Sequence, residues 1–372
     1  MASSSSLFVM QPLSGSIAPP AVVSRRRGWL GFVLGLVAVP WALLLLAAAG
    51  FVGASPSGWG YAVGFALVSA GLVSRPWRKR RGLTRAGLAV LLLIALARMV
   101  FADGTHVETL RLPDRGHRWV NRLVAERDGT LLAAHALVLS GGVPRSDSRD
   151  FISALESAFD RMDAAEGAFA TPAVATYLGL QSSKSFDTLV ISPPDGASSD
   201  TAVVFLHGYA GNFAVYCWQM ARAAQAISAL TVCPSVGPAG DWWSPQGERT
   251  LEATLDWLAS WGIRRVYLGG LSNGGAGASV LVSRVSHPRI ELRGLVLVSG
   301  AVSQAPTHQV PTLVVQGRTD SMMPTRSMRA FAERLGKLAT YVEVDSGHFA
   351  FLDRHAECER AIANWLRQRE GK

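Results

Sequence analysis

The stretch that decides the fold is residues 266–281, VYLGGLSNGGAGASVL. Its apolar first part is typical of a buried strand, and the small residues from Gly274 onward are typical of a closely packed helix. Ser272 stands between the two, in the pattern Gly-x-Ser-x-Gly formed with Gly270 and Gly274. A sharp strand-to-helix turn lifts such a serine hydroxyl above the sheet edge, where it can act as a nucleophile. The pattern alone is weak, so this hypothesis needs a base, an acid and oxyanion donors elsewhere in the chain.

Strands and helices alternate on both sides of this turn. Apolar runs predict strands over residues 186–191, 201–206, 229–233, 265–268, 295–298, 312–315 and 340–344. Helical spacing predicts helices over residues 151–162, 214–227, 248–261, 274–286, 325–337 and 352–368. This alternation indicates an α/β fold with a doubly wound, mostly parallel sheet.

An antiparallel beginning of the sheet is expected before residue 145. Alternating segments predict strands over residues 107–110, 119–125 and 131–139. Arg127-Asp128-Gly129 between the last two is a hairpin signal. Asp147 or Ser148 is expected to cap the helix that follows.

Polar residues follow the strands of the second half at the places where such sheets carry their sites. His207-Gly208-Tyr209 comes after one strand, Gly317-Arg318-Thr319-Asp320 after another, and Gly347-His348 after the last. Together with Ser272 they give the order Ser, Asp, His along the chain. This is one of the orders in which nucleophile, acid and base occur in serine hydrolases.

Residues from about 186 to 368 resemble the α/β-hydrolase superfamily, on its esterase and lipase side. The resemblance is carried by the His-Gly loop, the Gly-x-Ser-x-Gly turn, the Gly-x-x-Asp turn and the Gly-His turn, in that order. It implies that the N–H of Tyr209 is one oxyanion donor. The N–H of Asn273, at the positive end of the helix after Ser272, is expected to be the other.

The chemistry assigns a role to each residue. His348 would take the proton of Ser272 and later protonate the leaving group, while Asp320 would orient the imidazole and stabilise its charged form. Asp345, three residues before His348, is a rival acid that is better suited to bracing the histidine loop. His207 is expected to support the oxyanion loop rather than to react. The mechanism requires no cofactor and no metal.

The substrate pocket is less well defined by the sequence. Trp242, Trp243 and Met322 follow strand ends and are expected to line it, although ordinary packing explains the two tryptophans equally well. Residues 299–311 form only a short connection, so no large lid fits there. This favours an open site with soluble or small acyl substrates. Any cover would come from residues 140–185 or 235–247.

The charge is distributed unevenly along the chain. Residues 1–102 contain ten Lys/Arg and no Asp or Glu, so all 27 acidic residues lie in the remainder. The high pI therefore comes from the N-terminal part, and no basic face for nucleic acid is predicted on the folded domain. We expect a disordered tail over residues 1–24, a membrane region over residues 25–102 and a hydrolase domain over residues 103–372.

The membrane region contains up to three transmembrane helices, over residues 29–53, 59–74 and 83–102. A cleaved signal peptide is the alternative for the first, but that run is longer than a signal core and two more apolar runs follow it. Arginines and lysines lie before the first run and between the second and third. By the positive-inside rule, three spans or one place the hydrolase domain on the extracytoplasmic side, and two spans reverse this.

The three cysteines, Cys217, Cys233 and Cys358, are too few for a disulfide framework. A Cys217–Cys233 bridge fits an oxidising compartment, and three buried thiols are the alternative.

These observations predict a membrane-anchored serine hydrolase, in particular a carboxylesterase that acts through an acyl-enzyme on a small-molecule or lipid substrate. A peptidase, a thioesterase and a lipid acyl hydrolase use the same chemistry. A membrane-tethered binding protein on a hydrolase fold is the alternative from another class.

Overall fold

The computed structural model describes residues 21–75, 81–194 and 199–371. Residues 1–20 of the expected tail lie outside the described residues, and a helix begins at Ala21. Three helices precede the sheet: α1 (Ala21–Phe51), α2 (Pro56–Val73) and α3 (Arg81–Phe101). Among the described residues, Trp29–Phe51 and Gly82–Phe101 are long and apolar enough to cross a membrane.

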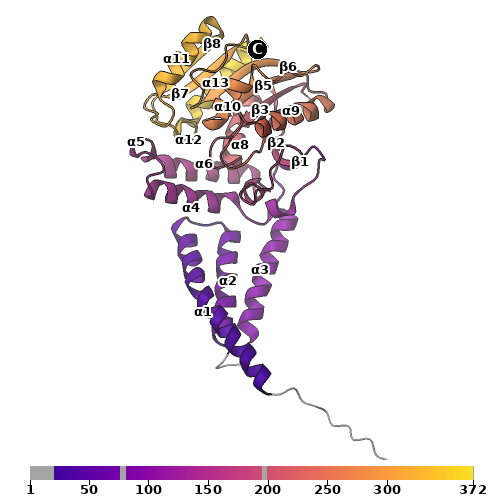
Figure 1. The fold of residues 1–372 in the computed structure, drawn as a ribbon, viewed down its shortest axis with the longest axis vertical. Coiled ribbons are helices and arrows are strands. Elements are labelled where there is room, and N and C mark those ends of the chain that lie inside the picture. Colours follow the sequence, from indigo (N-terminus) through magenta and orange to yellow (C-terminus); the bar gives the residue numbers. More distant parts are fainter. Residues whose placement is uncertain (1–20, 76–80, 195–198, 372) are drawn as a thin grey trace, which may run out of the picture. The chain divides into compact units, whose positions relative to one another are not determined.

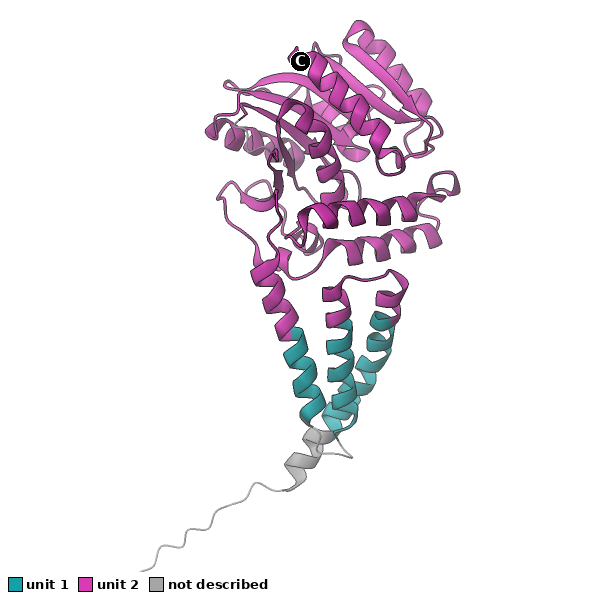
Figure 2. Cartoon of the chain, turned by 180° about the vertical axis from the view of Figure 1, so that it is seen from behind, with its two compact units in different colours: residues 1–46, 62–91 teal, residues 47–61, 92–372 magenta. Residues whose placement is uncertain are grey.

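The described chain divides into two compact units, coloured separately in Figure 2. One contains residues 21–46 and 62–91. The other contains residues 47–61 and 92–371, so the ends of all three helices belong to the same unit as the sheet. Hydrogen bonds explain this: Ser55 binds the Asp128 carboxylate, and the Tyr61 hydroxyl donates to the Leu123 carbonyl at 2.8 Å. The division therefore does not follow the expected boundary at residue 102.

An eight-stranded sheet forms the centre of the larger unit (Figure 1). Its strands lie in the order β1-β2-β4-β3-β5-β6-β7-β8. From β4 onward all neighbours are parallel, whereas β2 is antiparallel to both of its neighbours, β1 and β4. Their bounds are β1 Val107–Leu112, β2 Phe186–Ile191, β3 Thr201–Leu206, β4 Leu230–Pro234, β5 Arg265–Leu271, β6 Glu291–Val298, β7 Thr312–Gly317 and β8 Ala339–Val344. The mostly parallel α/β sheet is as predicted.

Helices cover both faces of this sheet. On one face, α8 (Ala214–Ala224), α12 (Ala350–Asp353) and α13 (His355–Glu370) form an apolar core with the strands. On the other, α9 (Pro245–Ser260), α10 (Asn273–Leu281) and α11 (Thr325–Leu335) form a second core. β2, β3 and β7 are buried along their whole length, and the sequence of β3 is accordingly a nearly continuous apolar run.

The expected hairpin before residue 145 is wrong. Residues 119–122 form a 3-10 turn, η1 (Trp119–Arg122), and residues 126–139 form helix α4 (Glu126–Leu139). Arg127-Asp128-Gly129 is the first turn of that helix. Leu131 and Ala134, three residues apart, are buried together in the core that includes α6 (Phe151–Glu166). Leu and Ala favour a helix over a strand, and this preference outweighs the hairpin signal.

Helices α4 and α6 lie side by side in Figures 1 and 2, joined through the short helix α5 (Arg145–Ser148). A further short helix, α7 (Ala173–Tyr177), precedes β2. Only residues 299–311 connect β6 to β7, so no large lid is inserted there. The helices before β2 take the place of such a lid.

Candidate active site

Ser272 lies at the tip of the turn between β5 and α10. Its backbone has φ 54° and ψ −119°, a region that residues other than glycine seldom adopt. The flanking glycines make this turn feasible. A Cβ on Gly274 would lie 1.9 Å from the Leu206 carbonyl oxygen, and one on Gly270 would lie 2.3 Å from the Gly274 carbonyl. The spacing Gly-x-Ser-x-Gly is therefore a requirement of backbone packing.

The structure brings Ser272, His348 and Asp320 into one hydrogen-bonded row. His348 Nε2 lies 3.0 Å from Ser272 Oγ, and His348 Nδ1 lies 2.9 Å from Asp320 Oδ2. The three residues come from the ends of β5, β7 and β8. They are neighbours because these parallel strands present their carboxyl ends at one edge of the sheet.

The Asp320 carboxylate is fixed from several sides. Its Oδ1 accepts the backbone N–H groups of Met322 and Met323 at 2.9 and 2.8 Å, and its Oδ2 accepts the Gln316 side-chain amide at 2.9 Å. Asp320 has a fully buried side chain, so these donors replace the water it lacks. Asp345, the rival acid, is 74% exposed at its side chain and pairs with Arg318. The geometry therefore joins His348 to Asp320.

The expected oxyanion donors flank Ser272. A Cβ on Gly208 would lie 3.2 Å from Ser272 Cβ, so the loop that carries Tyr209 passes directly beside the serine. Asn273 is the first residue of α10. Within the described part of the chain, neither backbone N–H donates to a protein acceptor. Both are thus free for a ligand oxygen, and the α10 dipole favours negative charge there.

His207 supports this loop without reaching the nucleophile. Its Nδ1 lies 2.8 Å from the Gly208 carbonyl and its Nε2 accepts the Val236 N–H at 3.1 Å. Burial lowers the pKa of His207 to about 4, so the ring is neutral at pH 7. A neutral ring with its proton on Nδ1 satisfies both contacts.

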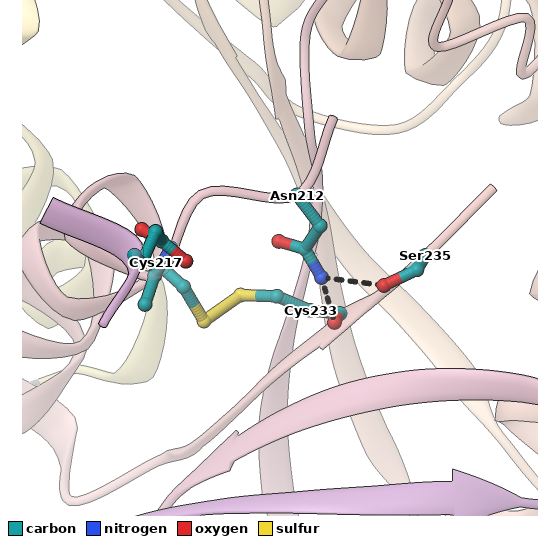
Figure 3. The surroundings of a disulfide bond; sticks show 6 residues. Asn212, Cys217, Cys233 and Ser235 are labelled. Carbon is teal, nitrogen blue, oxygen red and sulfur yellow. Dashed lines mark hydrogen bonds between the residues drawn. A yellow bond between two sulfur atoms is a disulfide. The ribbon is translucent and has the colours of Figure 1, made fainter. Parts of the chain in front are cut away.

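The disulfide Cys217–Cys233 lies next to the same loop (Figure 3). It joins α8 to β4, as the sequence allowed. The side chain of Asn212 donates to the Cys233 carbonyl at 2.7 Å and to Ser235 Oγ at 3.0 Å. These contacts anchor the far end of the oxyanion loop to the sheet.

A residue that the sequence did not reveal completes the site. Asp147, in α5, accepts the backbone N–H of His348 at 2.7 Å through Oδ1. Its Oδ2 accepts the hydroxyl of Ser321, the neighbour of Asp320. Asp147 was expected as a helix cap, but it caps neither α5 nor α6. No local pattern could reveal a contact across 201 positions of sequence.

The cavity over Ser272 has a volume of about 140 Å³, and no Asp, Glu, Lys or Arg of the described chain lines it. Met322 lines it, as expected. Its roof comes from α4 and α6, through Ala133, Leu137 and Leu155 among others. The cover is thus more extensive than the open site that the sequence suggested.

Neither tryptophan lines this cavity. Trp242 is fully buried beneath the oxyanion loop, where its indole N–H donates to the His207 carbonyl at 2.9 Å. It packs so closely that a Cβ on Gly277 would lie 2.2 Å from its own Cβ. Trp243 is 42% exposed and also lies outside the lining.

Comparison with known proteins gives one family match. Residues 248–350, from α9 to the first residue of α12, match the family model described as serine hydrolase (FSH1). No curated protein matches the chain.

Solved structures resemble about half of the chain. An α/β serine hydrolase homologue from Coxiella burnetii is 19% identical over 49% of this chain and 92% of its own, with a TM-score of 0.39. Est1E from Butyrivibrio proteoclasticus is 14% identical over 50% and 96%, with a TM-score of 0.41. A serine hydrolase without a lid from Xanthomonas campestris is 19% identical over 50% and 89%, with a TM-score of 0.39. The segment that matches the family model holds Ser272, Asp320 and His348, and this part of the chain is similar to the serine hydrolases.

Proposed function

We propose that the protein is a membrane-anchored serine hydrolase that cleaves acyl esters through an acyl-enzyme on Ser272. The observation that carries the proposal is the hydrogen-bonded row from Ser272 Oγ through His348 to Asp320. The backbone strain at Ser272 favours catalysis over a purely structural role, because such strain costs about 1–3 kcal/mol and gathers at functional sites.

Each residue of the site has its own role in the proposed reaction. His348 Nε2 takes the proton of Ser272 as the serine oxygen bonds to the acyl carbon. The carbonyl oxygen becomes negative and accepts the N–H groups of Tyr209 and Asn273. The bond to the alcohol oxygen then breaks, and the alcohol leaves with the proton from His348. Water repeats these steps on the acyl-enzyme, which releases a carboxylic acid and restores Ser272.

The test uses a fluorophosphonate probe, which reacts with activated serines. The purified full-length chain is expected to be labelled, and Ser272→Ala is expected to remain unlabelled. A panel of p-nitrophenyl esters then measures turnover, with a loss of about 10⁶ expected in the variant. Absence of labelling, or equal labelling of both proteins, would overturn the hydrolase proposal.

We also propose that α1, α2 and α3 anchor the chain and place the hydrolase domain on the extracytoplasmic side. The 18 residues of α2 correspond to about 27 Å at 1.5 Å per residue, near the roughly 30 Å of a bilayer core. The disulfide Cys217–Cys233 supports this side, because disulfides persist in oxidising compartments. Alkaline phosphatase fused after Lys372 should be active in cells, and an inactive fusion that accumulates would mean two crossings and a cytoplasmic domain.

A further inference from the structure

Helix α4 has an unusual composition for a surface helix. From Gly129 to Val143 the sequence contains no Asp, Glu, Lys or Arg. Leu132 and Leu139 are nevertheless exposed, Leu139 by 82%. A helix on the surface of a water-soluble protein normally turns charged side chains outward. The outer side of α4 is therefore suited to an apolar surrounding.

The side of α4 next to these leucines is fixed to the loop between α1 and α2. Ser55 donates its N–H and its hydroxyl to the two oxygens of Asp128, at 2.8 and 2.7 Å. The ring of Phe51, the last residue of α1, contacts His135 with centroids 4.5 Å apart. All these residues belong to one compact unit. These contacts hold α4 beside Phe51, the residue at which α1 ends.

Another side of α4 lines the cavity over Ser272, through Thr130, Ala133 and Leu137. At 100° per residue, the exposed positions 132, 136 and 139 lie between the side that binds the α1–α2 loop and the side that lines the cavity. The exposed apolar stripe thus runs around the helix from the expected membrane surface toward the nucleophile.

A second cavity continues the apolar surface. It has a volume of about 450 Å³ and shares Thr130, Ala133 and Phe213 with the cavity over Ser272. Leu178, which is 61% exposed, lies at its rim. Glu126 is its one charged lining residue among the described residues, so the two cavities together offer an acyl chain an apolar surface.

We infer that α4 lies in the bilayer surface and that its exposed stripe guides acyl esters dissolved in the membrane to Ser272. The substrate class is an ester of a membrane lipid with a long, uncharged acyl chain. Helices that lie in the bilayer surface insert their apolar face about 5–10 Å into the headgroup boundary. The inference rests on the proposed function, since it uses the same nucleophile and the same anchor, and it replaces the expectation of small soluble substrates.

The first experiment measures the position of α4 without reference to activity. Of the three cysteines, only Cys358 is free, and it is fully buried. A thiol-reactive bimane can therefore be attached selectively to Leu139→Cys or, as a control, to Ala356→Cys on the exposed side of α13. The full-length chain is reconstituted in phosphatidylcholine vesicles with and without brominated acyl chains. Bromine is expected to quench the label at 139 at least about threefold more than the label at 356, and equal quenching would overturn the inference.

The second experiment measures substrate delivery. Leu132→Glu and Ala136→Glu place charge on the stripe, and Ala356→Glu is a matched control on α13. Each protein in vesicles is assayed with water-soluble p-nitrophenyl acetate and with p-nitrophenyl palmitate dissolved in the same vesicles. The stripe variants should lose at least about tenfold in palmitate hydrolysis and keep acetate hydrolysis within about twofold, while the control keeps both.

The outcomes separate the two proposals. If the stripe variants lose hydrolysis of both substrates, or lose hydrolysis of neither, the membrane route is overturned while the hydrolase proposal stands. Failure of the unmodified chain to hydrolyse acetate or to accept the fluorophosphonate would overturn the proposed function itself. In the unmodified chain, each further buried methylene should raise kcat/KM by up to roughly fourfold until the cavities are filled.

Discussion

The edge of the sheet around Ser272 and the helical cover formed by α4 and α6 are built on different principles. At the edge, backbone contacts and buried polar bonds fix each group, and Asp320 accepts three donors besides His348. The cover is held mainly by apolar contacts such as those of Leu131, Leu155 and Phe159. Directional bonds fix atoms where the chemistry needs them, whereas apolar packing fixes a surface and tolerates variation in detail. We therefore expect changes at the edge to affect turnover and changes in the cover to affect substrate choice.

The largest effect is expected at the edge, from Asp320→Asn. An asparagine no longer stabilises the imidazolium of His348 and favours the wrong tautomer, so kcat should fall by about 10⁴. Asp345→Asn is the matched control and should change kcat by less than about threefold, because its carboxylate faces solvent and Arg318. Stopped-flow or steady-state assays with p-nitrophenyl acetate measure kcat for both variants. Similar losses in both variants would show that the histidine does not depend on Asp320 alone.

The two regions should respond to pH in opposite directions. Burial raises the pKa of Glu126, at the start of α4, to about 8, so the folded state holds a proton that the unfolded state releases above pH 4.5. Stability should fall as pH rises from 4.5 to 8, by on the order of 5 kcal/mol. For His207 the pKa is lowered to about 4, so the unfolded state binds the extra proton. Stability should fall as pH decreases from 6.5 to 4, by on the order of 3 kcal/mol.

Denaturant unfolding of the full chain in detergent across this pH range measures both limbs of the stability profile, namely the fall toward alkaline pH and the fall toward acid pH. Glu126→Gln retains an acceptor for the Ala214 N–H and should flatten the alkaline limb only. His207→Gln should flatten the acid limb only. If either substitution left its limb unchanged, the groups responsible would lie elsewhere in the fold.

Asp147 lies where the cover meets the edge, and its replacement tests how far the two are independent. Asp147→Ala removes the acceptor of the His348 N–H and of Ser321, so kcat should fall by about 10–100-fold, as expected for a hydrogen bond to a charged group. KM for a short ester should stay within about twofold. Asp147→Asn, which keeps one acceptor oxygen, should recover most of the loss.

Asp150→Ala serves as the control for this prediction, because its side chain makes no capping bond at the start of α6. It should leave kcat unchanged. A loss confined to KM in Asp147→Ala would instead indicate that the residue shapes the pocket and does not position the base.

The smallest effect is expected within the cover, from Gly129→Ala. A Cβ at this helical position would meet no atom of the described chain within 4 Å, in contrast to Gly274 at the edge. The substitution should raise the free energy of unfolding by about 0.5–1 kcal/mol, because alanine loses less backbone entropy in a helix. Thermal unfolding measures this. A decrease in stability would show that the cover is packed as closely as the edge.

The sequence predicted the edge better than the cover, and the reason is physical. The strands 186–191 and 201–206 have the bounds expected from the sequence. Residues 201–206 show the reason most clearly, because a strand buried on both faces is a nearly continuous apolar run. The turn at Ser272 carries its own pattern, because only glycine fits beside the neighbouring carbonyls. Both signals are local in the sequence, so they can be recognised without knowledge of the tertiary structure.

The cover lacked such a signal. Residues 130–139 are apolar apart from Thr130 and His135, so their alternation is too weak to separate strand from helix, and only their Leu and Ala content favours α4. Asp147 and Trp242 depend on partners that the sequence does not place, namely the His348 loop and the space left by Gly277. Tyr209 and Asn273 were predicted as oxyanion donors from their places after His207-Gly208 and Ser272, because a backbone N–H leaves no side-chain pattern of its own.

The short β6–β7 connection has a consequence for how this chain can evolve. Because residues 299–311 form only a short connection, the cover of the cavity is encoded almost entirely before β2, whereas Ser272, Asp320 and His348 all follow residue 271. Substrate selectivity and the proposed chemistry thus lie mostly in separate stretches of the gene, with Asp147 as the exception because it accepts the His348 N–H. Exchange of residues 113–185, between β1 and β2, with an aspartate kept at the place of Asp147, would replace the roof while it leaves every strand pairing and the row Ser272–His348–Asp320 in place. One recombination event could thus change the substrate of such a chain while Ser272, His348 and Asp320 stay in place.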